Sequence, residues 1–331
     1  FPVGITKEGD WILYTGSDYS LLPTGQWQEY PGNRRAAISP VRGQGLLSFE
    51  GDCVVRERID VVFPVLHGAN GEDGAMQGLL QMAGIPYVGP HVSASAVSMD
   101  KTLTKLVADN AGVPQARWQL VRNSDLDSRM DAILDQLEGK FDYPMFVKPA
   151  GTGSSVGVSK ATSREDLRSA LMDAGTYDEK ILVEEFIHGR EVEVAVMGNA
   201  SPVASVCGEI DSGAEFYDYE SKYITDTSTA YIPARIPAEA AEQVRETAVK
   251  IYSAIGCQGL SRVDFFVTYE DNRVVFNEIN TLPGFTSISM YPKLFMASGI
   301  SVLNNMDKEQ YNIFPVGITK EGDWILYTGS D

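Results

Sequence analysis

The two ends of the chain carry the same sequence, and this repeat constrains the fold more than any other feature. Residues 1–18 (FPVGITKEGDWILYTGSD) recur without a change as residues 314–331. In each copy two short apolar runs flank the turn KEGD, which predicts a β-hairpin. Two identical hairpins would compete for one place in a sheet, so we expect only one copy to dock there. One perfect copy is more typical of an engineered, permuted or mis-assembled chain than of a natural repeat array.

The segment in front of the second copy, residues 301–313, has the pattern of the end of a helix. A helix followed by this hairpin forms part of an α/β unit, and such a unit would naturally stand before residue 19. We therefore interpret residues 301–331 as displaced material of the N-terminal domain.

Composition excludes several classes of protein. Of the 331 residues 44% are apolar, and no run approaches the roughly 20 apolar residues of a membrane helix. The net charge of −18 disfavours nucleic-acid binding, which needs a basic face. The cysteines Cys53, Cys207 and Cys257 contain no C-x-x-C pair, which predicts reduced thiols in a cytoplasmic protein.

The first part of the chain alternates between strand and helix patterns. Residues 58–66 (RIDVVFPVL) form a continuous apolar run before a glycine-rich turn, which favours a buried parallel strand. A helix is expected over 75–85, a short strand follows in PYVG, and a second helix over 93–112 should end at Gly112. The sequence therefore predicts an incomplete α/β domain with a parallel sheet over residues 1–95.

The rest of the chain predicts two further lobes. Residues 96–182 contain the apolar runs ARWQLV and YPMFVKPA and helical patterns at 126–138 and 163–174, and the run KILVEEFI follows at 180–187. After Gly189 polar and apolar residues alternate, which is typical of antiparallel strands. A helix at 237–255 precedes the runs LSRVDFFVT and RVVFNEINT, which YEDN joins as a hairpin. We place the third domain at 183–300 and the displaced segment at 301–331.

A glycine- and serine-rich loop is the strongest local signal of chemistry. In FVKPAGTGSSVGVSK (146–160), Lys148 ends an apolar run, and small residues with exposed amides and hydroxyls follow. Such a loop can fold over phosphates, although it lacks the Gly-Lys-Ser/Thr ending of the P-loop. The alternative is a flexible surface loop without a ligand.

Two apolar runs near the C-terminus carry polar residues that suit a hard cation. Glu278 and Asn280 are two residues apart and share one strand face, and Asp264 can face them across the hairpin. Two carboxylates and an amide oxygen suit Mg²⁺ bound with a nucleotide. Arg262 shares a face with Asp264. The alternative is a surface salt-bridge cluster, which the apolar surroundings disfavour.

Six further or overlapping segments follow one another along the chain: LHGANGEDGAMQGLL, SMDKTLTK, VKPAGTGSSVGVSK, VEEFIHGREVEV, FYDYESKY and FNEINTLPGFTS. In order and spacing they resemble the motifs of the D-alanine–D-alanine ligases of the ATP-grasp superfamily, and the resemblance covers about residues 19–300. It implies an α/β and α+β multidomain protein, an ATP-grasp fold after an α/β N-terminal domain. It also implies ATP between the second and third domains, Mg²⁺ or Mn²⁺ as the metal, and a homodimer.

The resemblance also assigns an ATP site. Lysines would contact the phosphates, the strand around 184–187 would hold the adenine, and Glu191 would bind the ribose. The implied ATP-binding residues are Lys101, Lys148, Ser155, Glu184, Phe186, Ile187, Glu191, Lys222 and Asn277.

The same resemblance assigns the substrate and metal sites. Arg262 and the Gly284 amide would stabilise the tetrahedral intermediate, and Ser154 and Tyr223 would position the substrate. His67 and Glu72 belong to the first-substrate region, and Ser287 and Ser289 to the carboxylate site of the second substrate. The implied metal ligands are Asp264, Glu278 and Asn280.

The implied reaction is ATP-dependent joining of two D-alanines through an acylphosphate, for peptidoglycan precursor synthesis. Tyr223 argues against D-lactate as second substrate, and Tyr217 and Met290 favour D-alanine over D-serine. Three alternatives stay open: a D-alanine–D-serine ligase, another ATP-grasp carboxylate–amine ligase, and a non-catalytic nucleotide-binding derivative.

The sequence departs from the family pattern at its ends and at Ile288. The family's first strand, glycine-rich turn and substrate-binding glutamate are missing, and residues 301–331 stand where a closing helix is usual. Ile288 replaces a common histidine. We therefore expect ATP and Mg²⁺ binding to survive while ligation is weak.

Overall fold

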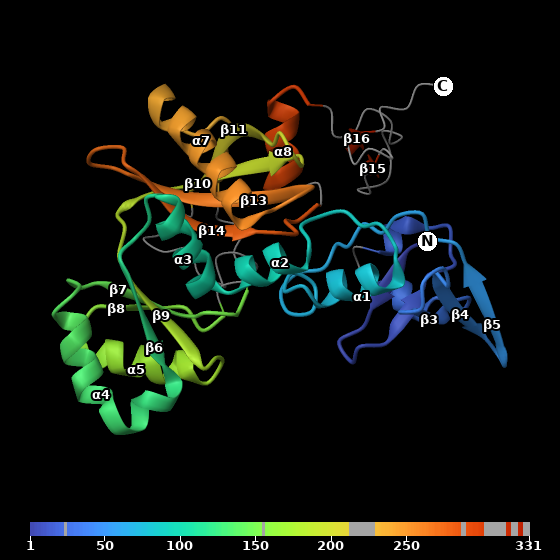
Figure 1. Cartoon of the computed structure of the whole chain (residues 1–331), viewed down its shortest axis with the longest axis horizontal. Helices are drawn as coiled ribbons and strands as arrows, with labels where there is room; N and C mark the ends of the chain where they lie inside the picture. The colour runs from blue at the N-terminus through green and yellow to red at the C-terminus, as the bar shows by residue number, and fades with distance from the viewer. Residues whose placement is uncertain are drawn as a thin grey trace.

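The computed structural model describes residues 1–22, 25–153, 156–211, 229–285 and 289–300, and the backbone of two short strands at 316–318 and 324–326. The described residues form four sheets, and the three larger ones each carry helices (Figure 1). In the described residues no helix is both long enough and apolar enough to span a bilayer.

The N-terminal sheet is antiparallel throughout, with its strands in chain order. It contains β1 (Val3–Ile5), β2 (Trp11–Leu13), β3 (Arg34–Ile38), β4 (Leu46–Glu50) and β5 (Cys53–Glu57), with the short 3₁₀ helices η1 (Tyr19–Leu21) and η2 (Gln26–Glu29) between β2 and β3. Leu13, Ala36 and Leu46 form its small core. Helix α1 (Ala75–Ala83) follows and ends at Gly84, whose φ of 69° suits a glycine cap.

The prediction of a parallel sheet in this lobe is wrong for the described part of the chain. The apolar run 58–66 makes one isolated parallel bridge, between Val62 and Tyr87. Val61 and Val65 remain 39% and 49% exposed. A parallel strand needs hydrogen-bonded partners along its edges, and this run has none beyond that bridge, although Ile59, Val62 and Leu66 pack against a core cluster.

The duplicated hairpin forms in both copies, as the sequence predicts. In the first copy Val3 pairs with Leu13, and in the second Val316 pairs with Leu326 in the same register. Only β2 of the first copy continues into a larger sheet, by pairing with β3. Strands β15 (Val316–Ile318) and β16 (Trp324–Leu326) form a separate two-stranded sheet. Among the described strands, those of the first copy join the N-terminal sheet while β15 and β16 pair with each other, which agrees with two segments competing for one place.

The single helix expected over 93–112 is two helices. Helix α2 (Val92–Met99) ends at Asp100, whose extended backbone breaks the run. The Asp100 side chain then accepts the N–H groups of Thr102 and Leu103 and caps α3 (Lys101–Ala111). An aspartate inside an otherwise helical pattern here acts as a cap, while Gly112 closes α3 as predicted.

The central lobe is a four-stranded antiparallel sheet in the order β6 (Trp118–Arg122), β9 (Lys180–Glu185), β7 (Met145–Pro149) and β8 (Ser159–Ala161). Helices α4 (Asn123–Glu138) and α5 (Arg164–Gly175) pack on this sheet through buried residues such as Leu134, Leu167 and Val147. Because β9 pairs with β7 as far as Glu185, the boundary proposed at 182/183 falls inside a strand of this sheet.

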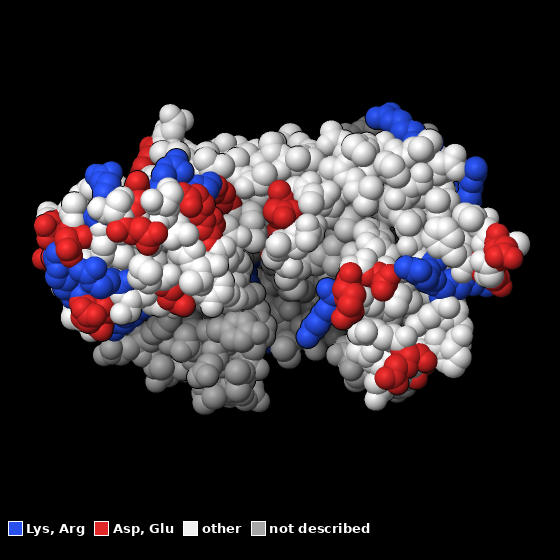
Figure 2. Space-filling view, turned by 90° about the horizontal axis from the view of Figure 1, so that it is seen from below, with Lys and Arg blue, Asp and Glu red and all other residues white. Residues whose placement is uncertain are grey.

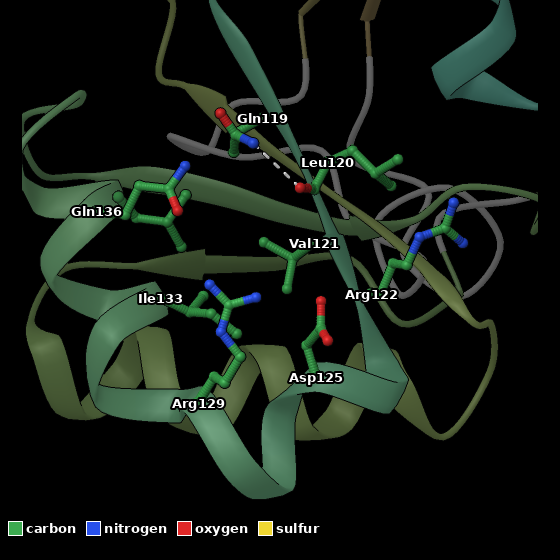
Figure 3. Close-up of a pocket in the computed structure, with 9 residues that line it drawn as sticks. Gln119, Leu120, Val121, Arg122, Asp125, Arg129, Ile133 and Gln136 are labelled. Atoms are coloured by element: carbon green, nitrogen blue, oxygen red, sulfur yellow. Dashed lines mark hydrogen bonds between the residues drawn. The ribbon is translucent and has the colours of Figure 1, made fainter.

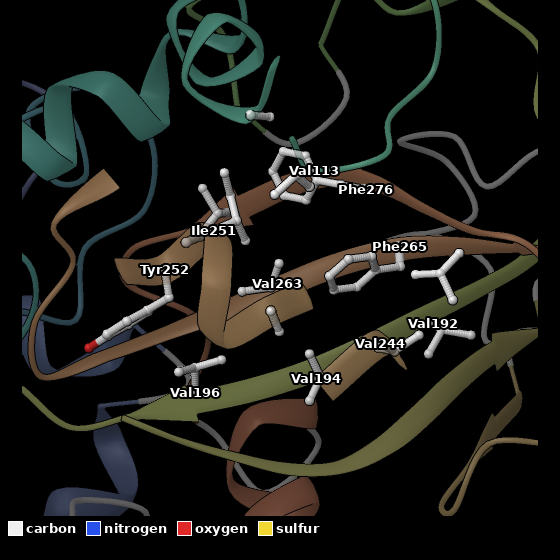
Figure 4. Close-up of a cluster of buried hydrophobic side chains, with 14 of the residues drawn as sticks. Val113, Val192, Val194, Val196, Val244, Ile251, Tyr252, Val263, Phe265 and Phe276 are labelled. Atoms are coloured by element: carbon white, nitrogen blue, oxygen red, sulfur yellow. The ribbon is translucent and has the colours of Figure 1, made fainter. Parts of the chain in front are cut away.

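The third lobe is a five-stranded antiparallel sheet in the order β12 (Thr229–Tyr231), β11 (Val203–Asp211), β10 (Gly189–Met197), β13 (Leu260–Thr268) and β14 (Val274–Asn280). Helix α7 (Ala238–Ile255) covers one face, where Val194 and Val263 pack against Val244 and Ile251 (Figure 4). On the other face, Ala195 packs against α8 (Met290–Ala297). The predicted hairpin of β13 and β14 is confirmed.

Candidate active site

The polar residues expected to bind a cation lie together on β13 and β14. Across the hairpin Asp264 pairs with Glu278, and Arg262 pairs with Asn280. The side-chain amide of Asn280 donates to Asp264 Oδ2 at 2.9 Å. The sequence-based placement of this group on one strand pair is therefore confirmed.

A β-bulge on β14 adds Asn277 to this face. Asp264 pairs with Glu278 while the next residue, Phe265, pairs with Phe276, so Asn277 is the extra residue. A bulge turns consecutive side chains toward the same side of a sheet. Asn277 Oδ1 lies 3.5 Å from Lys148 Nζ of the central lobe. The bulge thus lets a residue that alternation would turn away contact Lys148, which precedes the glycine-rich loop.

Arg262 is held by carboxylates on two strands. Its Nε and Nη2 donate to the two oxygens of Asp264 at 2.8 and 2.7 Å, and Nε lies 3.3 Å from Glu193 Oε2. Burial opposes the charged form, but Asp264 and Glu193 raise the pKa of the guanidinium well above its usual value. Arg262 is therefore a permanently charged, fixed group that can face a developing negative charge.

The donor set of this face suits a magnesium ion by its chemistry. Glu193, Asp264 and Glu278 stand in register on three adjacent strands, with one arginine among them. The surplus of negative charge and the amide oxygen of Asn280 favour a hard divalent cation. Among the described residues no cluster of three His, Cys, Asp or Glu side chains has metal-binding geometry, and Arg262 occupies Asp264. A cation would have to share Asp264 with Arg262.

A buried chain of charges faces this sheet from the central lobe. Glu184 Oε2 on β9 lies 2.7 Å from Lys148 Nζ on β7, and Glu184 Oε1 pairs with Lys105 of α3. Burial favours the neutral acid, but Lys105 and Lys148 lower the pKa of Glu184 to about 2. Burial likewise opposes the Lys148 ammonium, yet Glu184 raises its pKa. Glu184 and Lys148 are therefore both charged at neutral pH.

Lys101 is held over the start of the glycine-rich loop. Its Nζ donates to the Thr152 carbonyl at 2.6 Å, and its backbone N–H donates to Ala150 at 3.0 Å. The adjacent Asp100 forms an ion pair with Lys180 of β9. Both lysines expected to contact phosphates, Lys101 and Lys148, thus flank the loop that follows β7.

The strand end expected to hold the adenine continues from β9 toward the third lobe. Phe186 stacks on Phe146, with ring centroids 5.9 Å apart, and Ile187 packs with Ala116 and Val275 between the lobes. Glu191 lies on β10 in register with Phe266 of β13. The structure therefore brings these residues to the junction of the two lobes where a nucleotide is expected.

Glu72 links the N-terminal lobe to the loop after β14. Its carboxylate accepts the N–H of Gly68 at 2.7 Å and the N–H of Leu282 at 3.1 Å. Burial raises the pKa of Glu72, although both N–H groups act against that shift. Glu72 therefore fixes its own loop against the third lobe, a structural contact that the sequence does not reveal.

The other expected substrate residues in the described chain lie around the same loops. His67 is exposed at the start of the glycine-rich turn. A side chain on Gly284 would stand 2.6 Å from Ser289 Oγ, so these two residues lie against each other at the beginning of α8. Seven expected or discussed positions lie outside the described residues: Ser154, Ser155, Tyr217, Lys222, Tyr223, Ser287 and Ile288. The helix end expected at 301–313 lies outside them too.

Sequence reasoning missed two charged residues of this site, Lys105 and Glu193. Lys105 stands four residues after Lys101 on α3, a spacing that places both on one helix face. Glu193 is two residues after Glu191 on β10 and therefore shares its face. Both signals were present in the sequence, but each is also the usual pattern of a solvated surface.

Two other surface features carry no site residue. Charged side chains of both signs gather over the α4–α5 side, at the left of Figure 2, where Arg164 pairs with Asp135. A groove of about 190 Å³ lies between β6 and α4, with Arg129 and Asp125 on its helix side (Figure 3). Neither feature contains an expected active-site residue.

Two antiparallel-sheet lobes with lysines on one and a carboxylate–arginine face on the other define a ligase of the ATP-grasp class. Comparison with protein families agrees: D-ala D-ala ligase N-terminus matches residues 1–90 and D-ala D-ala ligase C-terminus matches residues 107–308. The chain belongs to the D-alanine–D-alanine ligase family and is an ATP-using ligase.

Individual relatives support this assignment over most of the chain. A D-alanine–D-alanine ligase of Chlorobium limicola is 53% identical and one of Acetivibrio thermocellus 50%, covering 93% and 92% of this chain and 85% and 84% of theirs. Among solved structures, the VanG D-Ala:D-Ser ligase of Enterococcus faecalis is 38% identical with a TM-score of 0.81. That match covers 90% of this chain and 84% of the other.

Proposed function

We propose that this chain joins two D-alanine molecules with the free energy of ATP hydrolysis, supplying a peptidoglycan precursor. The arrangement that carries the proposal is the Arg262–Asp264–Glu278–Asn280 face opposite the Lys148–Glu184 pair. Lys148 Nζ and Asn277 Oδ1, 3.5 Å apart, span the two lobes. Positive groups therefore stand on both sides of the space in which ATP phosphates would lie.

In the first step a carboxylate oxygen of one D-alanine attacks the γ-phosphorus of ATP, and ADP leaves. Lys101 and Lys148 orient the phosphates, and phosphoryl transfer depends mainly on such positioning. The product is an acylphosphate. Lys222 lies outside the described residues, and its contact with the γ-phosphate is part of the proposal.

In the second step the amine of the other D-alanine attacks the acyl carbon, phosphate leaves, and a proton is lost from nitrogen. Arg262 and the Gly284 N–H would stabilise the tetrahedral oxyanion, because fixed donors in an enclosed site need no reorganisation. Glu72 and His67 would line the first-substrate region, with Ser154 and Tyr223 aligning it. Ser287 and Ser289 would bind the second carboxylate.

A magnesium ion bound by Asp264, Glu278 and Asn280 is part of this proposal, and Mn²⁺ is the alternative metal. Bound there, it would neutralise charge on the ATP phosphates as phosphoryl transfer proceeds. Two carboxylates and one amide oxygen on adjoining strands support this ligand set.

The test measures ATP-dependent phosphate release together with the dipeptide product by mass spectrometry. We expect release to require D-alanine and the product to be D-alanyl-D-alanine, with L-alanine inactive. Release that depends on another amine would support a different ATP-grasp carboxylate–amine ligase. ATP binding without release under any of these conditions would identify a non-catalytic derivative and overturn the proposal.

D-serine as second substrate is the main alternative, because a solved relative with TM-score 0.81 is a D-Ala:D-Ser ligase. Met290 is buried at the start of α8 where D-serine-using relatives tend to carry arginine, which supports D-alanine. Equal concentrations of D-alanine and D-serine should yield mainly D-alanyl-D-alanine. A mixed dipeptide as the main product would reverse this choice.

A homodimer and a cytoplasmic location also belong to the proposal and rest on the family resemblance. Analytical ultracentrifugation tests the first, and cell fractionation tests the second.

A further inference from the structure

Lys105 is the most deeply buried charged residue associated with the site. Its side chain is 2% exposed, although it belongs to a helix whose next residue, Leu106, is 54% exposed. An isolated ammonium in such a place would be strongly unfavourable, so its carboxylate partner must compensate for the lost hydration. That partner is Glu184 Oε1 on β9.

The two carboxylate oxygens of Glu184 pair with different lysines. Oε1 forms an ion pair with Lys105, and Oε2 lies 2.7 Å from Lys148 Nζ. Lys148 is 16% exposed and also reaches toward Asn277, whereas Lys105 points away from solvent. Two lysines and one glutamate leave a net charge of +1, and the outer ammonium of Lys148 presents it to the space between the lobes.

Lys105 is also tied to the connection between the lobes. Its backbone carbonyl accepts the side-chain amide of Gln115 at 2.9 Å, and Gln115 forms a parallel bridge with Phe276 of β14. Phe276 immediately precedes the bulge residue Asn277. The helix that carries Lys105 is therefore fixed relative to both strands that Lys148 contacts.

We propose that Lys105 is a positioning residue for nucleotide binding: it holds Glu184 in place and neutralises it, so that the Lys148 charge is available to the phosphates of ATP. The inference rests on the proposed function only in taking Lys148 as a phosphate ligand. Without Lys105, Lys148 would be the only cation beside a buried carboxylate. The pair would then be neutral, and this cluster of two lysines and one glutamate would lose its net positive charge.

The experiment replaces Lys105 with methionine, which has a similar length and no charge. Direct calorimetric titration measures ATP and AMP affinity without D-alanine, so that the result does not depend on ligation. We expect ATP to bind about ten-fold more weakly or worse, since a charged contact is lost. AMP, which has only the α-phosphate, should change less. Lys250→Met is the matched control, because Lys250 is exposed and its side chain donates to the Gly112 carbonyl near the end of α3.

A merely structural role gives a different pattern. It predicts a lower melting temperature, and in the folded fraction the affinities for ATP and AMP would change equally or not at all. That result would overturn the proposal. Lys105→Arg, which restores the charge, should recover most of the ATP affinity. If K105M yields no folded protein, the experiment uses Lys105→Gln, which keeps a hydrogen-bond donor for Glu184 but no charge. This variant should also bind ATP more weakly, with a smaller change for AMP.

The double variant K105M/E184Q tests whether Lys105 acts through Glu184. Removing both charges leaves Lys148 unpaired in the site, so K105M should weaken ATP binding much less in the E184Q background than in the native chain. Equal losses in both backgrounds would show that Lys105 acts by another route and would overturn the proposal. Loss of ligation with ATP binding intact in the native chain would instead count against the proposed function alone.

Discussion

Arg262 is the residue whose geometry a lysine cannot reproduce. Its planar guanidinium donates to both oxygens of Asp264, whereas an ammonium is a point charge that cannot make this paired contact. We expect Arg262→Lys to fold normally and to lower kcat about 100-fold or more, as the loss of an oxyanion donor does. Steady-state kinetics and thermal melting measure the two effects.

The control for this substitution is Arg245→Lys on α7. Arg245 pairs with Glu242 and the Ser205 carbonyl, away from the site, and its replacement should leave kcat within about two-fold. A kcat for R262K within a few-fold of the native value would contradict the role assigned to Arg262.

Glu184 should make stability fall in acid over a defined range. Its folded-state pKa is about 2, below the ordinary value of 4.5, so the folded protein binds this proton more weakly than the unfolded chain. The stabilisation is therefore complete above about pH 4.5 and is lost as the pH falls toward 2. Urea unfolding should show Glu184→Gln less stable than the native chain at pH 7, with the difference shrinking below pH 4.5. A difference independent of pH would contradict this prediction.

At the residue scale, the sequence could predict the side chains expected to bind ligands. It could not predict the buried side chains that pair with them and fix their positions. Asp264, Glu278 and Asn280 share a face because strand alternation requires it, and the structure places them as expected. Lys105 and Glu193 were missed because a lysine on a helix face and a glutamate on a strand usually meet water. Only the packing of α3 on β9 turns Lys105 into a buried partner.

Asp100 is the feature that turns one expected helix into α2 and α3. Its side chain caps α3 and pairs with Lys180, and although burial opposes ionisation, these contacts lower its pKa. Asp100→Ala should destabilise the chain by about 1–2 kcal/mol, as loss of an N-cap does. Ser163→Ala, which removes the cap of α5 but no ion pair, should cost less in urea unfolding. If Ser163→Ala lowered the free energy of unfolding as much as Asp100→Ala or more, the ion pair with Lys180 would contribute nothing measurable to stability.

At the element scale, prediction succeeded where contacts are local and failed where distant partners decide. The antiparallel strands β10, β11, β13 and β14 were predicted because alternation and short turns fix antiparallel neighbours. The apolar run 58–66 was expected to form a parallel strand, yet it makes only the Val62–Tyr87 bridge. A parallel strand depends on neighbours distant in sequence, and an apolar run alone cannot specify whether they exist.

The whole active site depends on contacts between lobes, of which Glu72 provides one. Glu72→Gln keeps one acceptor oxygen but loses the other, so it weakens the link between the Gly68 turn and Leu282. We expect a several-fold higher KM for D-alanine with little change in ATP affinity, since the ATP-binding lysines lie elsewhere. Asp73→Asn in the same loop, where Asp73 accepts the backbone N–H groups of Asn70 and Ala75, is the control. A higher ATP Kd in E72Q would contradict this separation.

The identical ends of the molecule allow one deletion experiment with a perfectly matched control. Removing residues 1–18 and removing residues 314–331 delete the same amino acids. The first deletion removes β1 and β2 with the buried Leu13 and Tyr14, whereas among the described strands β15 and β16 pair with each other alone. We expect the first deletion to lower the melting temperature clearly, because each lost core residue costs about 2–5 kcal/mol. The second deletion should leave the melting temperature unchanged. Equal melting temperatures for the two deletions would show that either copy can fill the place beside β3.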